Sequence, residues 1–410
     1  FPYTTLFRSL IIYLAFISLG LPDSLLGSAW PIIRGEFGAP LGTAGVLYMI
    51  VAAGTIVSSL ASGSLLGRFG TGKVTLVSCL MTAAALLGYS AAPSVFWFGV
   101  FAIPLGLGAG AVDSGLNNYV AAHYKAHHMS WLHCFWGVGA TLGPVIMAGF
   151  ISGSGHWRSG YLTVSMIQFA LVVILLFSLP LWDRVARIAG DSRKEELREM
   201  EAEQPDERPV KPLRIPGVKL ALASFLFYCG VESTVGLWGS SYLVGIKGVD
   251  AATAASWVSL YFAGITVGRF IAGFVTFKLS NRVMIRAGQI IALFGAVVLV
   301  LPLPAALSLV GLLIIGLGLA PIYPCMLHET PVRFGKRQSP TIMGYQMAVA
   351  YTGSTFMPPL LGFLASHSTI GVFPVYIVLS AAAMWLFSER LNVFLKARSH
   401  APQESVVSPQ

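Results

Sequence analysis

The sequence predicts an all-α integral membrane protein of twelve transmembrane helices in two pseudo-symmetric six-helix bundles. Of the 410 residues, 55% are hydrophobic and only 10% are charged, and the mean hydropathy is +0.75. Soluble domains carry roughly 25% charged residues. Apolar runs of about 20 residues, each long enough to cross a bilayer, recur along the chain. These runs are too long and too uniformly apolar for the strands of a membrane barrel.

The apolar runs place the helices in order. The first half predicts helices over residues 10–31, 43–66, 74–93, 96–119, 130–152 and 160–181. The second half predicts helices over residues 217–244, 252–275, 284–302, 305–327, 341–365 and 371–392.

Five segments follow from this assignment. Bundles over residues 10–181 and 217–393 are joined by a polar linker over residues 182–216, and a tail covers residues 394–410. The linker contains RKEELREMEAE, which predicts a surface helix in a solvated connector, with a regulatory segment as the alternative. Residues 1–9, FPYTTLFRS, match the in-frame translation of a common sequencing adapter. We interpret them as an assembly artefact and exclude them from the fold.

Basic residues are distributed unequally between the two sides of the predicted bundle. One side holds only Arg34, Arg158 and Lys247, and apart from Arg8 in the excluded segment all other Lys and Arg fall on the opposite side. Lys and Arg collect on the cytoplasmic side of membranes. We therefore expect a cytoplasmic (inner) membrane location with both termini cytoplasmic. The sequence pI near 9.4 reflects these anchors and does not predict nucleic-acid binding.

Short motifs repeat across the linker. Residues 63–72 (GSLLGRFGTG) and 264–273 (GITVGRFIAG) both fit G-x-x-x-G-R-F-x-x-G, and we place both at the cytoplasmic end of the second helix of each half. A weaker echo pairs GATLGP at 139–144 with GSTFMP at 353–358. Two parallel six-helix repeats are the plan of major facilitator transporters. The G-x-x-x-G-R-F turns resemble the signature loop of that superfamily.

The same resemblance implies gating roles for two arginines. The family signature usually carries Asp before the Arg, whereas Gly67 and Gly268 stand there in this chain. Arg68 therefore lacks the expected neighbour. In the second half, we expect Arg269 to form an ion pair with Glu329 at the inner end of the tenth helix.

Three carboxyl side chains lie deep inside predicted spans: Asp23, Asp113 and Glu232. We expect no Lys or Arg at comparable depth. A charged side chain at mid-bilayer costs about 2.5 to 3.5 kcal/mol on insertion scales, so such a group binds a proton or faces water. The alternative is a hydrogen-bonded structural acid that never titrates. Pro22 precedes Asp23 and predicts a loosened first helix at that point.

Polar side chains accompany two of these acids at helical spacing. Asp113 and Asn117 are four residues apart on the fourth helix, as are Tyr228 and Glu232 on the seventh, so each pair shares a helix face. Trp238 lies further along the seventh helix.

These stretches resemble the fucose–proton symporter family, whose relatives include hexose permeases and sodium-dependent glucose transporters. The likeness rests on the helix-one Asp23, the Asp-x-x-x-Asn of residues 113–117, the Tyr-x-Gly-x-Glu of residues 228–232 and GLGLAPIYPCMLHETP at residues 316–331. It implies that Asp23 and Asp113 handle the proton. It also implies that Asn117 and residues of helices five, seven and eleven coordinate sugar hydroxyls.

Sugars are bound by side chains with both donors and acceptors together with an aromatic face. His133 and Trp136 supply these groups on the fifth helix, and Gln346 and Tyr351 supply them on the eleventh. The alternative for Trp136, Tyr351 and also Trp238 is a packed core residue, and for His133 a hydrogen-bonded core histidine.

The sequence therefore predicts a monomeric secondary transporter that takes up a small polar solute, by our interpretation a monosaccharide, by alternating access. The coupling ion is H⁺, with Na⁺ as the alternative. A proton-coupled efflux antiporter for a metabolite or drug is the nearest rival, since GVGATLGP partly resembles the Gly-Pro bend of antiporters. A membrane sensor or scaffold is a third class. No pattern predicts an enzyme, a metal site or an organic cofactor.

Overall fold

The computed structural model describes residues 2–123, 126–154, 156–202, 212–335 and 338–400, and nearly all of them are helical. The N half contains α1 (Pro2–Asp23), α2 (Leu25–Phe37), α3 (Thr43–Phe69), α4 (Thr71–Ala91), α5 (Val95–His123), α6 (Ala126–Ser154) and α7 (Trp157–Ala202). The C half contains α8 (Val218–Gly245), α9 (Ala251–Val275), α10 (Asn281–Val300), α11 (Ala305–Leu319), α12 (Ile322–Phe334), α13 (Ser339–Ser366) and α14 (Phe373–His400). Short 3₁₀ turns cover Pro212–Arg214 and Ile370–Val372.

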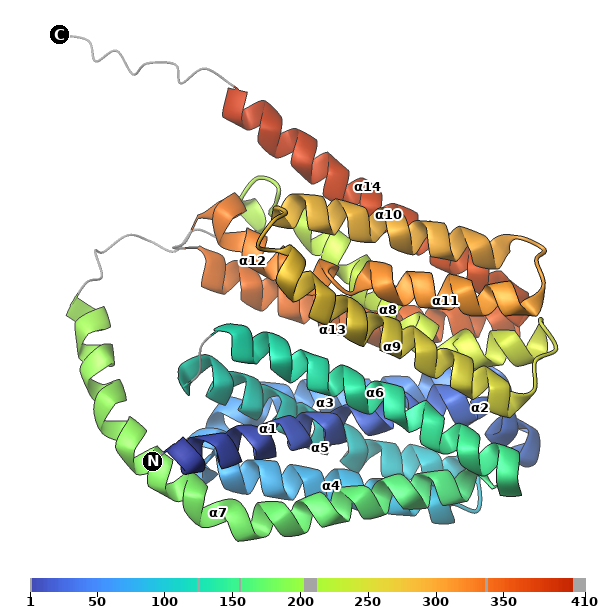
Figure 1. Ribbon diagram of the computed structural model, residues 1–410, viewed down its shortest axis with the longest axis horizontal. Helices are drawn as coiled ribbons and strands as arrows, with labels where there is room; N and C mark the ends of the chain where they lie inside the picture. Colours follow the sequence, from blue (N-terminus) through green and yellow to red (C-terminus); the bar gives the residue numbers. More distant parts are fainter. Residues whose placement is uncertain (1, 124–125, 155, 203–211, 336–337, 401–410) are drawn as a thin grey trace.

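These helices form twelve rods in the described chain, which confirms the predicted all-helical fold. The helices α1 and α2 make one apolar span over Leu10–Phe37, and α11 and α12 make another over Ala305–Phe334. Eleven rods are long and apolar enough to cross a membrane, and the twelfth rod is α13. The part of the predicted linker up to Ala202 continues α7 without a break, and Figure 1 shows this extension leaving the bundle.

The two halves repeat the same packing pattern. In the N half, α3 packs on α5, α4 packs on α5 and α7, and α1 packs on α6. In the C half, α9 packs on α11, α10 packs on α11 and α14, and α8 packs on α13. Each rod of the N half corresponds to the rod six places later in the chain, and every one of these packed pairs of the N half has its counterpart in the C half. The pseudo-symmetric arrangement of two six-helix bundles is therefore confirmed.

Glycines determine how closely the first and fifth rods of each half approach. A Cβ at Gly139 of α6 would lie 2.1 Å from the Ile17 carbonyl oxygen of α1. A Cβ at Gly353 of α13 would likewise lie 2.3 Å from the Leu226 carbonyl oxygen of α8. Gly139 and Gly353 are the first residues of the repeated motifs GATLGP and GSTFMP. The repeat therefore reflects the same requirement in both halves, a glycine where two helix backbones touch. Only a residue without a side chain allows backbones to pack this closely.

The G-x-x-x-G-R-F copies lie at different depths, so their predicted equivalence is wrong. In the first copy, Gly70 has φ +82° and ends α3 two residues after Arg68. Ile271 stands at the matching place in the second copy, and α9 continues to Val275. A glycine adopts a left-handed conformation without the steric cost that a β-branched residue meets. Arg269 consequently lies inside the rod rather than at its end.

The halves contact each other through α6 with α9, α3 with α13, and α2 with α8. Figure 1 shows α6 and α9 side by side along this boundary. We call the end that carries the N-terminus, the α7 extension and the end of α14 the linker end, and the opposite end the loop end. At the loop end, Gly42 N donates to Ser366 Oγ at 2.9 Å, and a Cβ at Gly27 would lie 2.3 Å from Gly236 O. The halves are thus closed against each other at the loop end.

Two helices of the C half, α9 and α10, begin with a side chain that caps the helix N-terminus. Asp250 caps α9 by accepting a hydrogen bond from Thr253 N at 2.9 Å, and this interaction lowers the pKa of the Asp250 carboxyl. Ser280 caps α10 in the same way through Val283 N.

The glycine contact between α1 and α6 yields a stability prediction. Gly139→Val should lower the unfolding free energy by about 1–3 kcal/mol, because the new side chain overlaps the α1 backbone. Thermal denaturation of the purified protein in detergent micelles measures the effect. Gly149→Val is the matched control, since a Cβ there has no atom within 4 Å. Equal losses of unfolding free energy in Gly139→Val and Gly149→Val would contradict the close packing of α6 on α1 at Gly139.

Candidate functional site

The first rod breaks where Asp23 lies. Pro22 is inside the last turn of α1, α1 ends at Asp23, and Ser24 separates it from α2. This agrees with the loosening predicted from Pro22. Asp23 is exposed although its neighbours in the rod, Leu21 and Leu25, are buried. Its Oδ2 accepts a hydrogen bond from Trp136 Nε1 of α6 at 2.8 Å.

The packing of α6 on α1 explains why Trp136 reaches Asp23. A Cβ at Gly20 would lie 2.0 Å from the Trp136 carbonyl oxygen, so the two backbones are in direct contact one turn before Asp23. This close approach positions the indole N–H beside the carboxylate. Asp23 therefore faces the inside of the bundle and is satisfied there by a donor from the same half.

Asp113 is bound from both halves. Asn117 Nδ2 donates to Asp113 Oδ1 at 2.9 Å, as their four-residue spacing on α5 predicts. Tyr351 Oη of α13 donates to Asp113 Oδ2 at 3.4 Å. All three side chains are partly exposed. This contact joins an acid of the N half to a hydroxyl of the C half.

Glu232 forms an ion pair with Arg269, which corrects the expectation that no basic residue lies at the depth of the acids. Arg269 Nη2 lies 2.9 Å from Glu232 Oε1 and donates to Tyr228 Oη at 3.3 Å. The exposed fractions of the two charged side chains are 10% and 15%. Tyr261 Oη also binds the Glu232 carbonyl oxygen at 3.0 Å. Arg269 reaches this depth because α9 continues past it.

Trp136 links the two charged centres across the boundary between the halves. The Arg269 guanidinium carbon lies 5.5 Å from the centroid of the Trp136 ring, within the range of a cation–π contact. The same indole donates to Asp23. Asp23, Trp136, Arg269 and Glu232 therefore form a continuous chain of contacts, which we call the central polar chain.

Aromatic residues surround this chain, and two of them were missed by the sequence reasoning. The ring centroid of His133 lies 5.8 Å from that of Tyr323 on α12, and His133 is partly exposed. Tyr48 of α3 is also partly exposed, and its hydroxyl lies beside the Ser233 side chain. Tyr48 and Tyr323 are the two residues that the sequence reasoning missed. Each is a tyrosine inside an apolar span, and a hydroxyl group at membrane depth is the sequence signal that could have identified them.

Two of the predicted substrate residues lie elsewhere. Trp238 is fully buried, and its Nε1 donates to the Pro358 carbonyl oxygen at 2.8 Å. Gln346 is 1% exposed, and its Oε1 accepts from Thr330 Oγ1 at 3.0 Å. Their hydrogen bonds join α8 to α13 and α12 to α13. Both residues pack the C half, away from the central polar chain, so the structure gives no support to a substrate contact for either.

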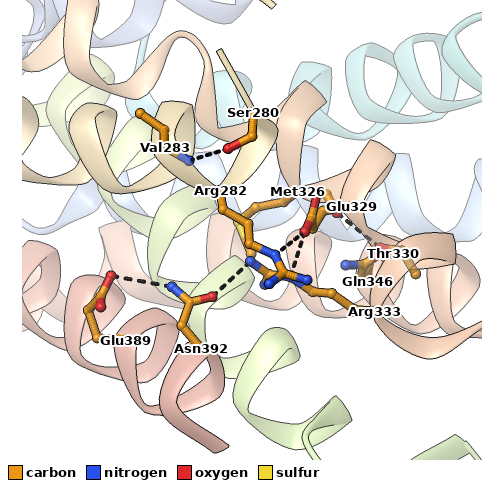
Figure 2. Close-up of polar contacts among 10 residues, drawn as sticks. All are labelled: Ser280, Arg282, Val283, Met326, Glu329, Thr330, Arg333, Gln346, Glu389 and Asn392. Atoms are coloured by element: carbon orange, nitrogen blue, oxygen red, sulfur yellow. Dashed lines mark hydrogen bonds and ion pairs between the residues drawn. The ribbon is translucent and has the colours of Figure 1, made fainter. Parts of the chain in front are cut away.

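The predicted ion pair of Arg269 with Glu329 is wrong. Arg282 and Arg333 both reach the Glu329 carboxylate, at 2.6 Å and 3.6 Å from its Oε1, and Figure 2 shows the two contacts. Arg269 instead binds Glu232. The sequence reasoning placed Arg269 at the end of its helix, and the continuation of α9 removes that placement.

The Glu329 cluster ties three rods of the C half together. Arg333 Nη2 donates to Asn392 Oδ1 at 3.1 Å, and Asn392 Nδ2 donates to Glu389 Oε1 at 3.3 Å (Figure 2). Arg286 completes the series by pairing with Glu389. Among the described residues, every partner of Glu329 belongs to the C half. Arg68 has no ion pair in the described chain, and its guanidinium lies over the ring of Phe69. The gating roles of these residues remain predictions.

Comparison with known proteins identifies the family. A family model described as Major Facilitator Superfamily matches residues 12–350. The chain belongs to this superfamily. It is therefore a multi-pass membrane transporter and not an enzyme. The D-xylose–proton symporter crystal structure has the same fold, with a TM-score of 0.72 at 14% identity over 93% of this chain and 97% of that chain.

Curated relatives in the superfamily carry different substrates. The chain is 24% identical to the cis,cis-muconate transport protein of Acinetobacter baylyi, over 97% of this chain and 95% of that protein. It is 23% identical to the glucose/mannose transporter GlcP of Bacillus subtilis, over 87% and 88% of the two chains. Relatives at this distance include carriers of sugars and of organic acids, so they leave the substrate of this transporter open.

The Glu232–Arg269 pair yields a prediction about stability. Glu232→Gln and Arg269→Gln should each destabilise the protein, because each leaves the other charge without its partner in a poorly hydrated site. The double variant should lose less than the sum, with a coupling free energy of about 1–3 kcal/mol. Equilibrium unfolding in mixed detergent micelles measures all four proteins.

A second cycle provides the control. Glu329→Gln combined with Arg269→Gln should be additive, because Glu329 binds Arg282 and Arg333 instead. A coupling free energy between Arg269 and Glu329, with none between Arg269 and Glu232, would contradict the Glu232–Arg269 ion pair.

Proposed function

We propose that this transporter takes up a small polar solute together with a proton by alternating access between its halves. The observation that carries the proposal is the position of Asp23. It is exposed to solvent between halves that are closed at the loop end, and it is connected through Trp136 to the Arg269–Glu232 pair of the other half. In this proposal, solvent reaches Asp23 from the linker end in this conformation.

Asp23 and Asp113 are the proton-binding groups in this proposal. Both carboxyls lie at depth, and neither has an Arg or Lys partner among the described residues. An unpaired carboxylate in an apolar environment gains by binding a proton. Asp113 also touches Tyr351 of the C half, so a change in the contact between the halves alters its surroundings. Protonation and the movement of the halves are coupled through this contact.

The side chains around the acids suit a hydroxylated solute. Asn117, Tyr351 and His133 offer donors and acceptors, and Trp136 and Tyr323 offer aromatic faces, all partly exposed. A monosaccharide ring presents hydroxyl groups on its edge and an apolar face, which matches this combination. The similarity to a glucose/mannose transporter supports the same substrate class.

The cycle begins with the halves open at the loop end. A proton binds Asp23 or Asp113, the solute binds between the halves, and closure at the loop end through Gly27 and Gly42 opens the linker end. Each elementary charge moved down the membrane potential contributes about 2.3 kcal/mol per 100 mV to accumulation. The distribution of Lys and Arg supports a cytoplasmic linker end and a location in the inner membrane. The chain acts as a monomer in this scheme.

Efflux by proton antiport is the second candidate, favoured by the GVGATLGP stretch of α6. The helix remains continuous through Pro144, and Gly143 packs against α1 at the Leu21 carbonyl oxygen. The stretch thus has a packing role that does not depend on the direction of transport.

Internal pH separates the two candidates. When solute is added outside proteoliposomes loaded with a pH-sensitive dye, symport should acidify the interior, because the proton enters with the solute. Antiport would make the interior alkaline. Liposomes without protein provide the control. Alkalinisation in response to a transported solute would replace the uptake proposal with efflux.

Asp113→Asn tests the assignment of the proton site. The amide retains the hydrogen-bonding shape of the carboxylate but cannot bind a proton. Uptake against a concentration gradient should fall to simple equilibration, whereas counterflow exchange of labelled for unlabelled solute should persist. Accumulation at the wild-type level would show that Asp113 does not carry the coupled proton.

A further inference from the structure

Trp136 is the only hydrogen-bond donor that reaches the Asp23 side chain from the described residues. Its Nε1 donates to Asp23 Oδ2 at 2.8 Å. A hydrogen bond to an ionised group is roughly twice as strong as one between neutral groups. Protonation of Asp23 removes the charge that makes this bond strong. The indole N–H therefore stabilises the ionised form of Asp23 over its protonated form.

The titratable side chains around the central polar chain do not replace this donor. They are Tyr48 of α3, Asp113 of α5, His133 of α6, Glu232 of α8 and Arg269 of α9. In the described chain, none of the five donates a hydrogen bond to the Asp23 carboxylate. The hydrogen bonds of Arg269 go to side chains of its own half. Trp136 is thus the group through which the C half acts on Asp23.

Helix α9 of the C half contacts the Trp136 ring in two ways. The Arg269 guanidinium carbon lies 5.5 Å from the ring centroid, and the Phe262 ring meets the indole edge to face with centroids 6.5 Å apart. A cation over an aromatic face attracts the electrons of the ring. This attraction polarises the N–H bond and strengthens the hydrogen bond that it donates. Contacts from one half therefore support the hydrogen bond to Asp23 inside the other half.

These contacts belong to the conformation in which the halves are closed at the loop end. Since Trp136 and α9 lie in different halves, movement of the halves changes the distance between them. We infer that Trp136 is a positioning residue that makes Asp23 release its proton when the loop end is closed. This inference rests on the proposed function, in which Asp23 binds the coupled proton.

The role of Trp136 supplies a step that coupling requires. A group whose ionised form is stabilised in one conformation binds a proton more weakly in that conformation. Asp23 therefore binds its proton with higher affinity while the loop end is open and releases it after the loop end closes. The proton passes from the Asp23 carboxyl to water at the linker end, and the indole keeps its own hydrogen throughout.

Infrared titration of the full chain in lipid bilayers tests the inference without a substrate. The C=O stretch of protonated carboxyl groups reports ionisation as the pH is varied, and Asp23→Asn identifies the contribution of Asp23. Trp136→Phe retains an aromatic ring beside Arg269 and removes the N–H donor. The pH midpoint of Asp23 ionisation should rise by about one unit in this variant, because a hydrogen bond to a charged group changes an equilibrium about tenfold.

Trp157→Phe is the matched control. Trp157 also donates its indole N–H to a carboxylate, that of Glu36, but this pair lies at the loop end of the N half. Its loss should leave the Asp23 midpoint unchanged. Thermal denaturation of both variants establishes that each is folded. Equal shifts of the Asp23 midpoint in Trp136→Phe and Trp157→Phe would contradict a specific role for Trp136.

A cross-link at the loop end tests the dependence on conformation. Gly42 and Ser366 meet there across the halves, since a Cβ at Gly42 would lie 2.7 Å from Ser366 Oγ. Oxidation of the double variant Gly42→Cys, Ser366→Cys with copper phenanthroline should join the two positions, because the Cβ atoms are within disulfide range. Oxidation should lower the Asp23 midpoint, because it retains the conformation in which the indole donates. With Trp136→Phe added, the same oxidation should lower the midpoint less.

Three results would overturn the inference: Asp23 does not titrate, its midpoint is the same with and without the Trp136 indole, or oxidation does not lower the midpoint while Trp136 is present. The last result decides even where Trp136→Phe does not fold. Failure of the proposed function is measured by transport instead. If glucose acidifies the liposome interior and the midpoint does not depend on Trp136, the symport proposal stands and this inference falls. If the midpoint depends on Trp136 and glucose causes no acidification, glucose symport falls and the link between Trp136 and Asp23 stands.

Discussion

The desolvation of charge inside an apolar bundle is the constraint on which the rest of this structure depends. Each of the three acidic side chains near the centre has a partner of a particular kind. Asp23 accepts from an indole, Asp113 accepts from an amide and a phenol, and Glu232 pairs with Arg269. An unpaired charge there would cost several kcal/mol. The Tyr351–Asp113 hydrogen bond and the Trp136–Arg269 contact cross the boundary between the halves, so relative movement of the halves changes how these charges are satisfied.

Glycine packing makes these contacts possible. The α1–α6 pair of the N half and the α8–α13 pair of the C half each bring two backbones together over a glycine, Gly139 or Gly353. The close approach within each half positions inward-facing side chains, and the small residues Gly27 and Gly42 allow the halves to meet at the loop end. The ionic cluster around Glu329 has a different role, because it joins rods of one half and leaves the boundary free.

Predictions from sequence succeeded where the relevant contact is local. Asp113 and Asn117 share a helix face and form the expected hydrogen bond, because a spacing of four residues fixes their proximity in any α-helix. The partner of Glu232 is Arg269, 37 residues away on another rod, and no periodicity encodes that contact. The error over Glu329 has a specific cause. The two copies of one motif were assumed to end their helices alike, whereas only the first has a glycine at the position of the stop.

The sequence by itself determined the membrane-spanning all-helical fold, the repeat of six rods and the presence of carboxyls at depth, because hydrophobic length and helical spacing are properties of short segments. The tertiary structure alone decided which charges meet. It removed Trp238 and Gln346 from the central site, added Tyr48 and Tyr323, and placed Arg269 between Glu232 and Trp136. The physical reason is that contacts between rods depend on the rotation and depth of each helix, which packing across the whole bundle determines.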